Sequence, residues 1–132
     1  MIHAHILLID ADHRVLLSQL AAMGDITLWD VPAVAVSSTG DIEQNLVNYL
    51  QSDWHVTTTT KALFPLCFTT DKDAIHVLYG CRNWIGLQGL QRVQSMDDIP
   101  TQWVRVPRLS DHALSPALQA LLPNIMTLLG TG

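Results

Sequence analysis

Charged side chains are scarce in this chain, and glutamate is the scarcest of them. Charged residues make up 14% of the 132 positions, against about 25% in an average globular protein. Glu43 is the single glutamate, and the seven lysines and arginines are scattered along the sequence. Together with a formal net charge of −5, this scatter argues against binding to the phosphate backbone of a nucleic acid. So few charges also leave apolar surface for a partner to cover, and we expect a homodimer.

Cysteines are few, and long apolar runs are missing. Cys67 and Cys81 are the two cysteines, and both fall inside apolar, strand-like runs, so we expect buried free thiols in a reducing compartment. No stretch reaches the roughly 18 uncharged apolar residues of a membrane span. Residues 1–10 lack the basic region of a signal peptide. These features predict a cytoplasmic protein that does not interact with membranes.

The first half of the sequence changes from strand-like to helical patterning. Residues 2–9 and 14–18 are predicted to form a hairpin around a polar turn, and residues 27–31 a short strand that Pro32 ends. From 41 to 54 the apolar residues recur at helical spacing. Asp41 is expected to cap the start of this helix, in a capping box with Gln44, with Glu43 as a first-turn charge favourable to the helix dipole.

The second half returns to strands and closes with a helix. We expect a long strand over 57–68, its hairpin partner over 74–84, a loop over 85–101, a strand over 103–106 and a helix over 114–129. Pro123 is predicted to kink that helix or split it in two. The order of elements indicates one α+β domain spanning residues 1–132, large enough to bury its own core.

Residues 32–56 match the frame of a motif without insertion or deletion. In P-G-G-x5-E-x7-R-E-U-x-E-E-x-G-U, where U is apolar, Pro32 occupies the first position and Val56 the last. This frame, at the third predicted strand and first helix, resembles the Nudix box. Trp29-Asp-Val-Pro32 and Trp103-Val-Arg-Val106 resemble segments that flank the box in that family. The resemblance covers nearly the whole chain and implies an α/β/α sandwich with a central mixed β-sheet.

Nudix hydrolases use the glutamates of this box to hold magnesium against a nucleoside diphosphate derivative, where the metal activates water. Residues at i, i+3 and i+4 share a helix face, which lets three carboxylates converge on a hard cation. In this sequence most of those positions carry other residues. The two glycines, the first glutamate, the arginine, the next three glutamates and the last glycine become Ala33, Val34, Gly40, Asn48, Tyr49, Ser52, Asp53 and His55. Asp53 alone keeps a carboxylate, so no metal is expected on this helix.

Other polar and aromatic residues are candidates for a ligand pocket. His3 and His5 lie two apart on a strand and therefore point to one face, with Tyr49, Ser52 and Trp84 as further candidates for the pocket wall. A metal ion is not expected at the histidines, since the sequence offers no evident third ligand. Asp97 and Asp98 fall in the loop before the last strand, a region from which some Nudix hydrolases supply a catalytic base.

The function therefore stays open between two classes, and the sequence leaves uncertain whether the chain is an enzyme. The first is a non-catalytic Nudix-fold domain that binds a nucleotide-like small molecule or a protein and needs no cofactor. The alternative is a divergent Nudix hydrolase of a nucleoside diphosphate derivative, which would use Asp53 with Asp97 or Asp98 and magnesium brought by the nucleotide. A third hypothesis, a DNA-lesion recognition module, fits the acidic chain poorly.

Overall fold

The first strand, β1, lies in the interior of a mixed four-stranded sheet. In this computed structural model, which describes residues 2–23, 26–37, 40–71, 73–86 and 101–129, the strand order of that sheet is β4-β1-β6-β5. β1 runs parallel to β6 and antiparallel to β4. Such a position suits its sequence, because a strand covered on both faces is largely apolar, and Ala4, Ile6, Leu7 and Leu8 are all buried.

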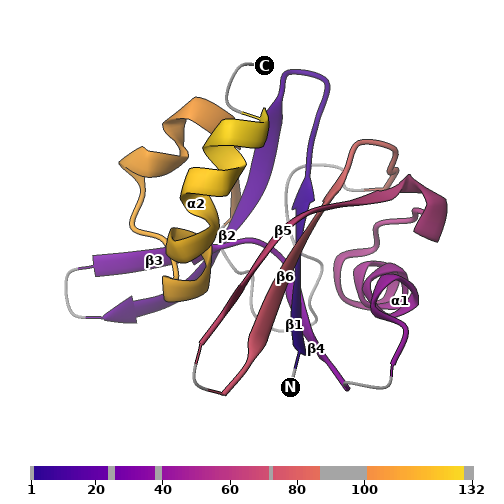
Figure 1. Cartoon of the computed structure of the whole chain (residues 1–132). Helices are drawn as coiled ribbons and strands as arrows, with labels where there is room; N and C mark the ends of the chain where they lie inside the picture. The colour runs from indigo at the N-terminus through magenta and orange to yellow at the C-terminus, as the bar shows by residue number, and fades with distance from the viewer. Residues whose placement is uncertain (1, 24–25, 38–39, 72, 87–100, 130–132) are drawn as a thin grey trace.

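The remaining elements complete an α+β domain (Figure 1). The elements are β1 (Ile2–Leu8), β2 (Arg14–Met23), β3 (Ile26–Asp30), β4 (Ala33–Val36), α1 (Ile42–Trp54), the 3-10 turn η1 (Thr60–Ala62), β5 (Leu63–Thr70), β6 (Ile75–Cys81), β7 (Thr101–Arg105), the 3-10 turn η2 (Val106–Asp111) and α2 (Pro116–Leu129). A second, antiparallel sheet has the order β3-β2-β7.

The two helices cover opposite faces of the four-stranded sheet, α1 on the right and α2 on the left in Figure 1. Side chains of β1 alternate between two cores, since Ile6 and Leu8 belong to the α1 side, and Leu7 and Ile9 to the α2 side. α1 contributes Leu46, Leu50 and Trp54 to its core, and α2 contributes Leu118, Leu121, Leu122, Ile125 and Leu129. This arrangement confirms the expected sandwich of helices around a mixed sheet.

The predicted hairpin between residues 2–9 and 14–18 is wrong. The turn itself forms, with the Asp10 amide donating to the Arg14 carbonyl at 2.9 Å, and one bridge joins Ile9 to Val15. Beyond that bridge the strands separate into different sheets. β1 already has β4 and β6 as hydrogen-bonded neighbours, so no edge is left on which β2 could continue to pair.

Other predicted boundaries also shift. Thr57–Thr60 does not open the long strand, because the Thr57 backbone exchanges two hydrogen bonds with Ile85 (2.9 and 3.1 Å), and β5 begins at Leu63. The strand predicted over 74–84 ends at Cys81, and β4 was not expected as a strand. Most of the predicted 85–101 loop lies outside the described residues.

The helices follow the predictions more closely. Asp41 caps α1 as expected, its carboxylate accepting from the Gln44 amide at 3.1 Å. α2 runs as one helix through Pro123, so of the two predicted outcomes, a kink or a split, the split does not occur. Pro123 has no backbone N–H to donate to the carbonyl of Gln119. Because both residues are exposed, water can donate to that carbonyl instead. No described helix is long and apolar enough to cross a membrane.

Candidate functional site

The box-like positions of α1 form a short polar strip beside its buried face. Tyr49 is half-buried, and its hydroxyl oxygen accepts a hydrogen bond from Trp54 Nε1 at 3.0 Å. One turn further, the Ser52 hydroxyl donates to Asp53 Oδ1 at 3.0 Å. The amide oxygen of Asn48 accepts from Gln44 Nε2 at 3.0 Å. Each of these side chains therefore has a hydrogen bond to another residue of the same helix.

The backbone at the end of α1 fits the box frame. His55 adopts a left-handed conformation, with φ 55° and ψ 36°, and its amide donates to the Leu50 carbonyl. The box has its closing glycine at this position, and glycine is the residue that tolerates such a conformation best. The frame thus places a glycine where the helix needs a left-handed residue, although this chain has a histidine there.

The other end of the box is crowded around Gly40. A Cβ atom at this position would lie 3.1 Å from Val36 Cγ1 and 3.2 Å from the Ser37 hydroxyl. Both distances are tighter than ordinary van der Waals contact. A larger residue at Gly40, such as the glutamate of the box, would require those neighbours to move by a few tenths of an ångström.

His3 and His5 meet a third histidine on the α2-side face of the sheet. His76, on β6, pairs with His3 across the parallel ladder, and the two rings stack with centroids 5.1 Å apart. His5 Nε2 lies 3.1 Å from His76 Nδ1, and His76 Nε2 lies 2.9 Å from Asp71 Oδ2. If Nε2 carries the proton in both rings, each histidine donates to its neighbour, and the chain ends on the Asp71 carboxylate.

The buried end of this series of hydrogen bonds, His5, faces Asp30. His5 is 4% exposed, and its Nδ1 has no hydrogen-bond partner among the described residues. That atom lies 4.0 Å from Asp30 Oδ1, the limit of ion-pair range. Burial, with His76 and His3 nearby, lowers the pKa of His5 to about 4, so His5 is neutral at pH 7. Burial also raises the pKa of Asp30, against hydrogen bonds from the Val31 amide and the Ser115 side chain.

Comparison with solved structures identifies the architecture. A MutT structure from work on Aliivibrio salmonicida and Vibrio cholerae matches 96% of both chains at 12% identity with a TM-score of 0.75. The Escherichia coli ORF135 protein matches 96% of this chain and 90% of its own at 19% identity, with a TM-score of 0.74. The NUDIX domain of Shewanella oneidensis NrtR, solved with ADP ribose, matches 98% and 88% at 17% identity, with a TM-score of 0.63. This chain has the Nudix fold.

The likeness lies in the structure, because no family model and no curated protein matches the sequence. In the Nudix fold of this chain, Tyr49, Ser52 and Asp53 lie together on α1, as the sequence frame predicted. Asp97 and Asp98, the other candidate catalytic residues, lie outside the described residues. Within the described ranges, no cluster of three or more histidine, cysteine, aspartate or glutamate side chains is arranged to hold a metal ion.

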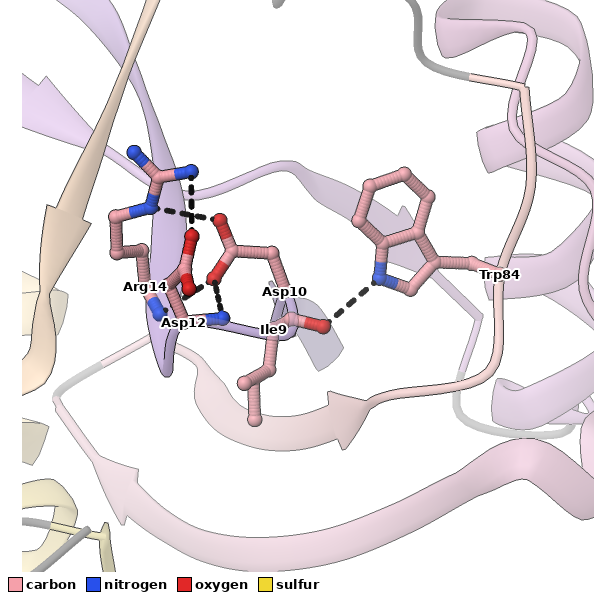
Figure 2. Close-up of polar contacts among 5 residues, drawn as sticks. All are labelled: Ile9, Asp10, Asp12, Arg14 and Trp84. Atoms are coloured by element: carbon pink, nitrogen blue, oxygen red, sulfur yellow. Dashed lines mark hydrogen bonds and ion pairs between the residues drawn. The ribbon is translucent and has the colours of Figure 1, made fainter.

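The predicted site residues therefore fall into three separate places. Tyr49, Ser52 and Asp53 lie on α1, while His3 and His5 point from β1 toward the opposite side of the sheet. Trp84 follows the end of β6, where its indole Nε1 donates to the Ile9 carbonyl at 3.1 Å (Figure 2). It lines two neighbouring cavities of about 520 and 430 Å³, and its role as the wall of a ligand pocket stays a prediction.

Sequence reasoning missed the partners of the histidines. The neighbours of His5 come from other elements: His76 lies on β6 and Asp30 on β3. Asp71, which bonds to His76, lies in the turn between β5 and β6. Ser115 bonds to Asp30 from the segment before α2. The sequence alone could have pointed to His76, because it is a polar residue within an otherwise apolar, strand-like run. The pairing of β1 with β6 was needed to bring it beside His3.

Proposed function

We propose that this Nudix-fold protein binds a small, nucleotide-like molecule and does not hydrolyse it. The polar strip of α1 carries the second part of the proposal, the lack of hydrolysis, because Tyr49 and Ser52 stand at positions of box glutamates. The ligand itself is proposed to bind on the opposite side of the sheet, at His3 and His76. The Tyr49 hydroxyl is engaged by Trp54, and Asp53 is bonded by Ser52. These bonds use the side chains within the helix and reduce what they can offer a cation.

Magnesium chemistry gives the physical reason. Mg²⁺ requires near-octahedral oxygen coordination and is usually held by one or two carboxylates together with phosphate oxygens. Across the box positions of α1, Asp53 contributes one carboxylate, on a side chain shorter than glutamate. The residues present do not fit a dedicated magnesium site, and a ligand would be held through hydrogen bonds and aromatic contacts.

The ligand class rests on the fold relatives. The NUDIX domain of NrtR is solved in complex with ADP ribose, so ADP-ribose is a suitable first probe. The histidine-rich face offers stacking and hydrogen bonding to such a molecule, since His3 is half-buried and its ring stacks on His76. Base stacking on a ring is worth roughly 1–3 kcal/mol when removed by alanine.

The binding test measures the affinity for ADP-ribose by isothermal titration calorimetry, without added metal. His3→Ala is expected to weaken binding roughly tenfold, while the control His112→Ala, a half-buried histidine after η2, should bind like the wild type. The same ligand is then incubated with magnesium and assayed for phosphate release after phosphatase treatment. Magnesium-dependent cleavage that Asp53→Ala abolishes would establish the alternative, a divergent hydrolase, and refute the proposal.

A box-restored variant provides the positive control for the alignment. It carries Gly40→Glu, Tyr49→Glu, Ser52→Glu and Asp53→Glu. Three carboxylates on one helix face should bind magnesium, and a metal that binds the folded state alone raises the melting temperature. Loss of the half-buried Tyr49 and crowding at Gly40 are expected to lower the metal-free melting temperature. A folded variant whose melting ignores magnesium would show that the box frame is misaligned.

We also propose that the protein is a cytoplasmic homodimer. β5 is an edge strand of the four-stranded sheet, and its Phe68 side chain is 67% exposed. Leu128 of α2 is 51% exposed, and both residues line one surface hollow. A second copy would cover these apolar groups. The free cysteines, Cys67 and Cys81, fit a reducing compartment.

A further inference from the structure

We propose that the cavity between the segment after α1 and the segment after β6 is a second binding site, for a phosphate-bearing small molecule. The cavity has a volume of about 520 Å³, within the range of small-molecule sites. Its lining consists of Thr57, Thr58, Thr59, Lys61, Ala62, Arg82, Asn83, Trp84 and Ile85. None of the box-like positions of α1 takes part, so this site does not depend on the function proposed above.

The charge of the lining selects an anion. Lys61 and Arg82 both line the cavity, and none of the described residues that line it is acidic. Neither cation has a hydrogen bond or ion pair within the part of the chain that the structure describes. The whole protein has seven lysines and arginines and a net charge of −5, so two cations in one cavity that have no partner among the described residues make a local positive region.

A phosphate group matches this lining better than a single carboxylate. A phosphate monoester carries about −1.5 to −2 charges at pH 7 and three acceptor oxygens. Two cations can balance that charge, and a guanidinium can donate two parallel hydrogen bonds to it. The hydroxyl groups of Thr57 and Thr59 add further donors at the wall.

The walls of the cavity are held in place by hydrogen bonds. Thr57 and Ile85 exchange two backbone bonds, and the Thr58 hydroxyl donates to the Asn83 carbonyl at 2.6 Å. Gly86, with φ +113°, lets the chain pass so close to the His55 carbonyl that a Cβ would collide with it. A site that is already ordered loses less entropy on binding.

Trp84 gives the site an aromatic wall and a fixed orientation. Its ring stacks on Trp103 with centroids 5.5 Å apart and planes 9° apart. A neighbouring cavity of about 430 Å³ shares Trp84 and Arg82. The carboxylate of Asp10 lines that neighbour, but Arg14 Nε bonds to it at 2.8 Å (Figure 2). Asp10 therefore pairs with Arg14, which also lies 3.5 Å from Asp12, and no ion pair joins Asp10 to Arg82 within the described residues.

The test titrates the whole protein with inorganic phosphate and with phenyl phosphate at constant ionic strength, and follows the indole N–H resonances by NMR. We expect saturable binding that shifts the Trp84 resonance, with phenyl phosphate binding more tightly because its ring contacts Trp84. Lys61→Gln and Arg82→Gln should each weaken binding roughly fivefold. Arg108→Gln is the matched control, because Arg108 is an exposed arginine on η2, and its binding should equal that of the wild type.

Lys61→Gln and Arg82→Gln both change exposed side chains, so their melting temperatures should stay close to that of the wild type. A loss of phosphate binding in either variant would therefore not reflect unfolding. The proposal is overturned if phosphate produces no saturable shift of the Trp84 resonance. It is equally overturned if Arg108→Gln weakens binding as much as Arg82→Gln, since that outcome would mean general attraction to the surface.

Discussion

Lowering the pH from 7 to 5 is expected to destabilise the fold, because His5 takes up a proton in the unfolded chain before it does so in the folded protein. Its pKa is about 4 in the folded protein against 6.5 in the unfolded chain, because the ring is buried next to two other histidines. The unfolded state therefore binds the proton at a higher pH. The stability contributed by neutral His5 is complete above about pH 6.5 and is lost as the pH falls toward 4.

The size of the effect follows from the shift in pKa. One pKa unit corresponds to about 1.36 kcal/mol, so the full loss amounts to about 3 kcal/mol. Between pH 7 and pH 5 the loss is about 2 kcal/mol. For a domain of this size that corresponds to a fall in melting temperature of roughly 5–10 °C. Asp30 acts in the opposite direction, since its raised pKa adds stability as the pH falls through it.

The assay is urea unfolding at pH 7 and pH 5, monitored by tryptophan fluorescence, for the wild type and for His5→Gln. Glutamine keeps a donor that can reach His76 but cannot take up a proton in this range. The other charged or titratable side chains that face His5, namely His3, His76, Asp30 and Asp71, are the same in both proteins. His5→Gln should lose about 2 kcal/mol less than the wild type, and His112→Gln should behave like the wild type. Equal losses in the wild type and His5→Gln would refute the reasoning.

Three further predictions concern the backbone and the surface. His55→Gly should raise the free energy of unfolding by about 1 kcal/mol, because it removes a left-handed conformation from a residue with a Cβ atom; a decrease in urea unfolding would contradict this. Gly86→Ala should lower the free energy of unfolding by roughly 1–3 kcal/mol, because Gly86 has a positive φ and lies close to the His55 carbonyl. An unchanged midpoint of urea unfolding would show that the turn adapts. Light scattering should give twice the 14.6 kDa chain mass for the wild type and the monomer mass for Phe68→Asp; a monomeric wild type would end the homodimer proposal.

The sequence by itself determined the class of the fold and the place of α1. Ile42, Leu46 and Leu50 recur at helical spacing, and Asp41 supplies a cap, so local interactions specify where this helix begins. The box frame also predicted where the helix ends, since the last glycine position falls on His55 in its left-handed conformation. Such features are readable because each depends on residues within a few positions of one another.

The tertiary structure decided how the strands pair and which side chains meet. The turn after β1 could be predicted, but whether β2 would pair along β1 depended on β4 and β6 occupying both of its edges. The same pairing places His76 beside His3 and His5, and Asp30 arrives from another sheet. The cavity with Lys61 and Arg82 likewise needs the bridge between Thr57 and Ile85. These contacts join residues far apart in the chain, whose proximity follows from burying two apolar faces of one sheet, and no local pattern encodes it.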